Sequence, residues 1–107
     1  MFKITAEPKF THPVTVMVPV DDGHKEQTFK CTFRVEDVEA LDQLQGEEGQ
    51  KGVLQRVVCG MSDLVGEDNQ PVPYSAELRD QLIGVPYVRI AMFLTYMGAV
   101  TKAKAGN

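Results

Sequence analysis

The chain has 107 residues, of which 43% are hydrophobic and 24% charged, as in an ordinary folded domain. Its formal net charge of −4 argues against broad binding to nucleic acid backbones, and its longest mostly apolar stretch, 85–100, is shorter than a membrane span. No basic-then-apolar leader opens the chain. We therefore expect one cytoplasmic domain over residues 1–107, with a flexible tail at 101–107 and with neither nucleic acid nor membrane as a partner.

The first third of the sequence alternates apolar and polar residues, as β-strands do. The alternation covers VTVMVPV at 14–20 and TFKCTFRV at 28–35. Because DDGHKEQ between them contains turn formers, we predict a β-hairpin closed by a long, mobile loop. Pro19 cannot donate to a sheet ladder, so its strand should lie at an edge or contain a bulge. FKIT at 2–5 is a candidate third strand.

From Glu36 onward the apolar spacing changes to that of helices. The first apolar series is Val35, Val38, Leu41 and Leu44. The segment GEEG at 46–49 should end this helix. A second series consists of Val53, Leu54, Val57, Val58 and Met61. It predicts another helix that stops near Gly60, with Leu54, Val58 and Met61 in the core rather than on a contact surface.

The segment VGEDNQPVPYS at 65–75 is either an acidic metal site or a turn that leads into a helix. Oxygen-bearing side chains are present at Asp63, Glu67, Asp68 and Asn69. Their spacing does not match a calcium-binding loop. A turn fits better, because Gly66 and Asn69 tolerate left-handed backbone angles and Ser75 can cap the following helix. That helix should end near Gly84.

Pro86 suits the first turn of a final helix, PYVRIAMFLTYMGAV at 86–100. Apolar side chains cover most of its circumference, and Arg89 is its only charged residue. A domain of this size can pack such a helix on one side but cannot enclose it completely. We expect part of it to contact another chain, the alternative being a central core helix. The candidate interface residues are Val88, Phe93, Leu94, Tyr96 and Met97.

The predicted fold is α+β, with an N-terminal antiparallel β-hairpin or small sheet followed by three or four helices. His12 and His24 lack the neighbours of a catalytic triad or metal site, and the glycines form no phosphate-binding motif. Cys31 and Cys59 lack CxxC spacing and fit a reducing compartment. We expect no enzyme, cofactor or metal; a small hydrolase is the weakest alternative.

The order of these features resembles a known family. The β-rich start with FKCTFRV, the phrase VVCGMSDLVGEDNQPVPYSAELRDQL, the final apolar helix and a short basic tail resemble the tail assembly chaperones of long-tailed bacteriophages and prophages. The last two thirds of the chain resemble them best. Two positions depart from the family's pattern: Met61 stands where Trp is common, and Asn69 replaces a turn glycine. Asn can keep the same backbone, whereas Met61 loses an aromatic anchor.

The resemblance implies a non-enzymatic assembly factor in the cytoplasm of the bacterial host, absent from the mature virion. Such a protein binds the tape measure protein before the tail tube polymerises around it. In the family, a frameshift-extended product often engages the tail tube protein. Apolar grooves and formation of a homo-oligomer would suit this role. The alternative is a structural component of the virion, such as a minor tail or head-tail joining protein.

Overall fold

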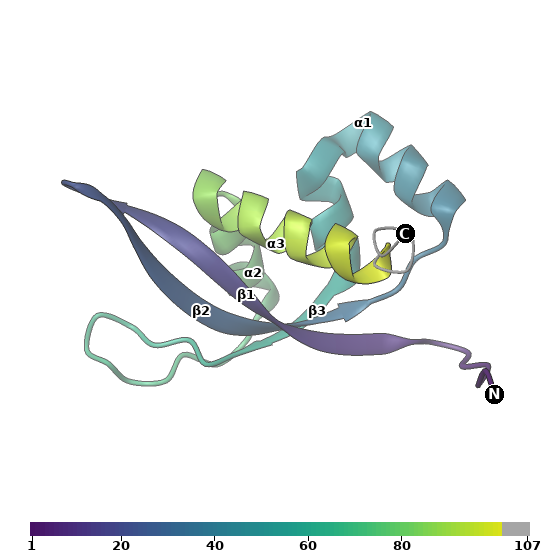
Figure 1. Cartoon of the computed structure of the whole chain (residues 1–107), viewed down its shortest axis with the longest axis horizontal. Coiled ribbons are helices and arrows are strands. Elements are labelled where there is room, and N and C mark those ends of the chain that lie inside the picture. Colours follow the sequence, from purple (N-terminus) through teal and green to yellow (C-terminus); the bar gives the residue numbers. More distant parts are fainter. Residues whose placement is uncertain (102–107) are drawn as a thin grey trace.

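The structure, a computed structural model that describes residues 1–101, combines one three-stranded antiparallel sheet with three helices (Figure 1). The elements in chain order are β1 Lys9–Val20, β2 Gly23–Arg34, α1 Val38–Val57, β3 Val58–Ser62, α2 Ala76–Ile83 and α3 Pro86–Val100. The predicted α+β class is therefore confirmed. The flexible tail predicted at 101–107 lies, apart from Thr101, outside the described residues.

Strands β1 and β2 form a hairpin much longer than the apolar alternation indicates. They pair from Lys9 opposite Arg34 to Val20 opposite Gly23, so that only two residues, Asp21 and Asp22, connect them. The predicted long loop is wrong. The tip of the hairpin extends past the helices (Figure 1), and residues 23–27 are exposed on both faces of the sheet. Their sequence therefore lacks the alternation of apolar and polar residues that indicates a half-buried strand.

The sheet has the order β1-β2-β3, which makes β1 an edge strand as expected from Pro19. In a two-residue hairpin, Val20 and every second residue before it form backbone hydrogen bonds to the partner strand. The backbone N–H and C=O groups of the residues between them point away from that strand, toward the free edge of the sheet. Pro13 and Pro19 therefore both have their backbone nitrogens on the free edge. The ladder loses no hydrogen bond, and the free edge lacks two of the donors that would invite another strand.

The third strand is β3 rather than FKIT. It pairs antiparallel with β2, with Lys30 opposite Ser62 and Phe33 opposite Val58, and its register shifts between Thr32 and Phe33. The prediction of a helix up to Gly60 is wrong, because α1 ends at Val57. The edge of β2 that does not pair with β1 offers backbone hydrogen-bond partners to residues 58–62. The apolar spacing within 53–61 alone cannot show that such a neighbouring strand is present.

Helix α1 consists of two helical segments that meet at Gly49. This glycine has φ 68° and ψ −154°, a conformation that residues with a Cβ adopt only under strain. The predicted break at 46–49 is confirmed at its last residue. Asp37 caps the first segment, since its Oδ1 accepts a hydrogen bond from the Ala40 N–H at 2.8 Å.

We expect Gly49→Ala to lower the free energy of unfolding by about 1–3 kcal/mol, because the positive φ at this position strains a residue that has a Cβ. Gly46→Ala is the matched control. A Cβ would meet no atom within 4 Å at either position, and only Gly49 has a positive φ. Alanine at Gly46 should be neutral or should stabilise by up to about 1 kcal/mol. Urea unfolding followed by circular dichroism compares the two, and equal effects would contradict a backbone break at Gly49.

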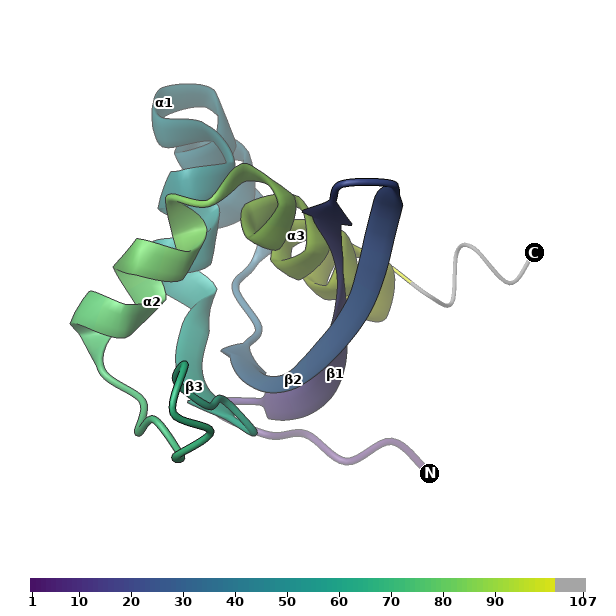
Figure 2. The same cartoon turned by 90° about the vertical axis from the view of Figure 1, so that its left-hand side faces the viewer.

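The core lies between the curved sheet and the helices. Strands β1 and β2 curve past one side of α3, while α1 and α2 lie on its other side (Figure 2). Tyr96 on α3 is at the centre, with its ring centroid 5.3 Å from that of Phe33 and 6.1 Å from that of Phe10. Leu54, Val58 and Met61 are buried, as predicted.

Candidate interaction surface

Helix α3 has one buried face and one open face. Val88, Met92 and Tyr96 point into the core. On the opposite side, the exposed fractions of Tyr87, Ile90 and Leu94 are 39%, 47% and 63%. Their spacing of three and four residues places them in one row along the helix. We call this row, with the half-buried Ala91 and Met97 beside it, the outer face of α3.

The single charge of α3 points away from this outer face. The Nε of Arg89 donates to the Gln50 Oε1 at 3.4 Å, and its Nη1 donates to the Ile83 carbonyl at 3.5 Å. Arg89 therefore links α3 to α1 and to the end of α2. As a result, the outer face is both apolar and uncharged, which is the kind of surface that a partner's apolar side chains can cover.

The structure divides the five predicted interface residues into two groups. Val88, Phe93 and Tyr96 are buried in the core with at most 8% of their surface exposed, and Val88 also lines an apolar groove beside the hairpin. Leu94 is exposed and Met97 is half-buried, so these two lie where a partner could reach them. Tyr87 and Ile90 complete the row and are absent from the predicted set. A helical projection would have grouped them with Leu94.

An apolar groove lies beside the outer face. Tyr87 belongs to the outer face and also lines the groove. The groove has a volume of about 560 Å³ and lies between the hairpin, the start of the 63–75 loop and the junction of α2 with α3. Its apolar lining includes Val16, Val18, Phe29, Leu64, Leu82 and Val85. The charged residue in its lining is Asp63, which forms a solvent-exposed ion pair with Lys30 at 3.7 Å. Pockets of this size and apolarity commonly take apolar ligands or side chains.

The loop that borders this groove is held by its backbone, which confirms the predicted turn. The Val72 N–H donates to the Leu64 carbonyl at 2.8 Å, and the Gly66 N–H donates to the Gln70 carbonyl at 3.0 Å. Asn69 has the left-handed φ of 62°, as expected. Gly66 does not, and Asp63 adopts φ 61° instead. Among residues 1–101, no three His, Cys, Asp or Glu side chains are grouped so that they could hold a metal ion.

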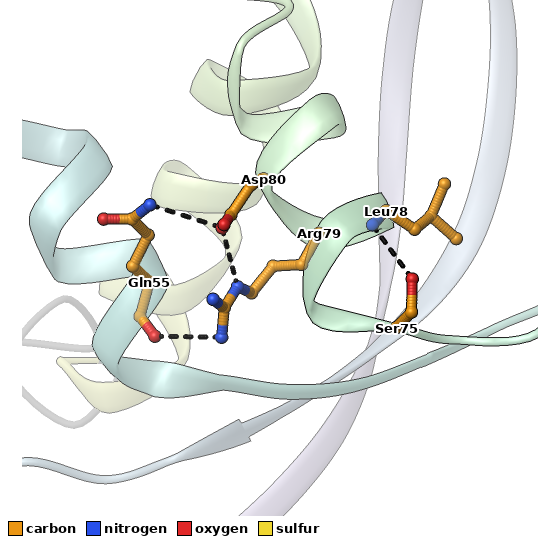
Figure 3. A network of polar contacts seen from close by, with 5 residues as sticks. All are labelled: Gln55, Ser75, Leu78, Arg79 and Asp80. Atoms are coloured by element: carbon orange, nitrogen blue, oxygen red, sulfur yellow. Dashed lines mark hydrogen bonds and ion pairs between the residues drawn. The ribbon is translucent and has the colours of Figure 1, made fainter.

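A polar network fixes α2 against α1 and so positions one wall of the groove (Figure 3). Ser75 caps α2 as predicted, since its Oγ accepts from the Leu78 N–H at 3.0 Å. The Arg79 Nη1 donates to the Gln55 carbonyl at 3.3 Å, near the end of α1, where carbonyls lack helical partners. The hydrogen bond from Arg79 holds the pKa of Asp80 below its usual value, and Gln55 contributes a second one.

A second, polar hollow of about 390 Å³ lies where β1 begins. Glu7, Lys9 and Arg34 line it together with Glu36 and Arg56, so its charges have both signs. The Arg56 Nε lies 3.3 Å from the Glu36 Oε1, which pairs two of these charges with each other. A hollow with such mixed charge does not favour a ligand of either sign.

The two cysteines differ in environment, and both are free thiols. Cys31 is fully buried on β2, and burial, followed by the nearby Cys59, raises its pKa to about 12. Such a thiol stays protonated at neutral pH and is a poor nucleophile. Cys59 is half-buried and its Sγ lies 3.5 Å from the Thr32 carbonyl, which suits a weak hydrogen bond across the β2–β3 pair.

The fold and this surface define an α+β domain with an open apolar helix face beside an apolar groove. No protein-family model, curated protein or solved structure matches the chain. Within residues 1–101, no single helix has the length and apolarity to cross a membrane. Helices α2 and α3 would meet that length and composition only together, and they are bent by 104° at their junction.

Proposed function

We propose that this protein is a phage tail assembly chaperone, without enzymatic activity, that binds an apolar helix of the tape measure protein on the outer face of α3. The observation that carries the proposal is the exposed, uncharged row of Tyr87, Ile90 and Leu94. The resemblance of the phrase VVCGMSDLVGEDNQPVPYSAELRDQL to this family directs the proposal to phage tails.

The outer face suits a helical partner in both geometry and energy. Apolar residues three and four positions apart on a partner helix can pack against the row on α3. Burying a fully exposed Leu or Ile side chain contributes about 1.5–3 kcal/mol. Ile90 and Leu94 are 47% and 63% exposed, so each can contribute roughly half of that, and several contacts together can hold a segment reversibly. The net charge of −4 helps to keep the complex in solution while the apolar segment is covered.

In this proposal the protein acts in the cytoplasm of the bacterial host and does not remain in the mature virion. A frameshift-extended product would carry the contact with the tail tube protein. The domain described above would then supply the contact with the tape measure protein. Val88, Phe93 and Tyr96 would support the outer face from within the core and would not touch the partner.

The test is co-expression with the tape measure protein encoded in the same gene cluster. We expect a soluble complex with the natural sequence and an at least tenfold weaker complex, a loss of about 1.4 kcal/mol, with Leu94→Lys. The lysine would place a charge in the middle of the apolar contact. Met17→Lys is the matched control, because Met17 is an exposed apolar residue on the sheet and lies opposite Glu26. This variant should bind like the natural protein.

Two results would contradict the proposal. The first is the absence of a complex when both proteins are soluble. The second is equal loss of binding in Leu94→Lys and Met17→Lys, which would show that the outer face of α3 is not the site. Detection of the protein in purified virions would instead favour the alternative, a minor tail or head-tail joining protein.

A further inference from the structure

Residues 1–8 carry exposed apolar side chains that the domain does not cover. The exposed fractions of Phe2 and Ile4 are 91% and 88%. In an extended chain, residues two positions apart point to the same side, so these two side chains can form one apolar face. The segment is joined to the domain where the Val35 N–H donates to the Pro8 carbonyl at 3.1 Å.

The groove between the hairpin and the α2–α3 junction has the matching chemistry. Its wall is formed mainly by aliphatic and aromatic side chains, among them Val16, Val18 and Phe29. Asp63 adds a carboxylate to the lining; its side chain is 62% exposed and forms an ion pair with Lys30 at 3.7 Å, so a second cation would share it with Lys30. Lys3 lies between Phe2 and Ile4 in the sequence. In an extended segment seated with both apolar side chains in the groove, Lys3 points outward and can approach the carboxylate of Asp63.

Residues 1–8 do not reach the groove of their own chain. Figure 1 shows residues 1–8 leaving β1 at the end of the molecule opposite the hairpin turn. The groove is lined by Val16 and Val18 of β1, which lie seven and nine residues beyond Lys9, about 23–30 Å along the strand. The inner face of β1 between these points is covered by α3, where Phe10 stacks on Tyr96. The accessible groove is therefore one on another copy.

We propose that residues 1–5 of one copy of this chain bind in the apolar groove between the hairpin and the α2–α3 junction of a second copy. Phe2 and Ile4 insert into the groove, and Lys3 lies beside Asp63. The donating segment and the accepting groove lie toward opposite ends of the folded molecule. The contact is therefore head-to-tail, so that it adds copies in a row or closes a ring. The outer face of α3 stays free in such an assembly, apart from Tyr87, which also lines the groove.

The test measures molar mass in solution by light scattering for three variants. Phe2→Ser combined with Ile4→Ser removes the donating side chains from an exposed segment, and Val18→Lys places a charge in the groove. We expect the natural chain to be oligomeric and both variants to have the mass of one 11.9 kDa chain. Met17→Ser, next to Val18 but on the opposite sheet face, is the matched control and should keep the natural mass.

Mixing the two variants gives a sharper result. The Phe2/Ile4 variant keeps an intact groove, and the Val18→Lys variant keeps an intact segment, so an equal mixture should form pairs of two chains and stop there. A monomeric natural chain, or a Phe2/Ile4 variant with unchanged mass, would overturn the proposal. So would a mixture that stays monomeric while circular dichroism shows both variants folded. Leu94→Lys should keep the natural mass, which separates this contact from the binding of the tape measure protein.

Discussion

Replacing Tyr96 with alanine should lower the free energy of unfolding by about 3–5 kcal/mol, the usual cost of removing a large buried aromatic side chain. Tyr96 is 0% exposed, and its ring packs against those of Phe10 and Phe33. Its hydroxyl accepts a hydrogen bond from the Glu36 N–H at 3.3 Å, which ties the start of α1 to α3. Because small domains are stable by only about 5–15 kcal/mol, this variant should be close to unfolding.

Two tyrosine variants separate the contributions to this effect. Tyr96→Phe keeps the ring and removes the hydroxyl, so it should cost about 1 kcal/mol. Tyr87→Ala changes the same residue type on the outer face of the same helix, and we expect it to cost less than about 1 kcal/mol. Urea unfolding monitored by circular dichroism measures all three. Equal losses for Tyr96→Ala and Tyr87→Ala would contradict the assignment of a buried and an open face to α3.

The parts of the fold that the sequence predicts are those with local signals. Ser75 and Pro86 mark the starts of α2 and α3, and both helices begin where these residues indicate. The hairpin follows from the alternation around Val14 and Phe29. Strand β3 was not predictable in this way, because it is short and its stability comes from pairing with β2, about 30 residues earlier in the chain.

The sequence indicated that α3 could not be enclosed, but it did not indicate which side stays open. The buried row with Val88 and Tyr96 and the exposed row with Ile90 and Leu94 are both apolar. Their difference arises from the position of β1 on one side and of α1 and α2 on another. Arg89 gave no guide either, because its guanidinium reaches Gln50 and a carbonyl on the packed side and does not mark the solvent side.

Raising the pH from 9 to 12 should remove about 3 kcal/mol of stability through Cys31 alone. Burial raises the pKa of this thiol from its ordinary value of 9.0 to about 12. Below pH 9, the thiol is protonated in both the folded and the unfolded chain, so the full stability is present. Above that pH, the unfolded chain releases the proton and the folded chain keeps it, which costs about 1.4 kcal/mol for each pH unit. Burial also raises the pKa of Tyr96, so its titration acts in the same direction at higher pH.

The measurement is the free energy of unfolding in urea at a series of pH values from neutrality upward. Cys31→Ala should be somewhat less stable at neutral pH, because it leaves a small cavity, but its stability should fall much less steeply above pH 9. Cys59→Ala is the matched control, since Cys59 is only half-buried, and it should keep the steep loss. If Cys31→Ala lost stability as steeply as the natural chain, other groups would account for the alkaline unfolding. The buried thiol would then not be what limits the stability of this sheet at high pH.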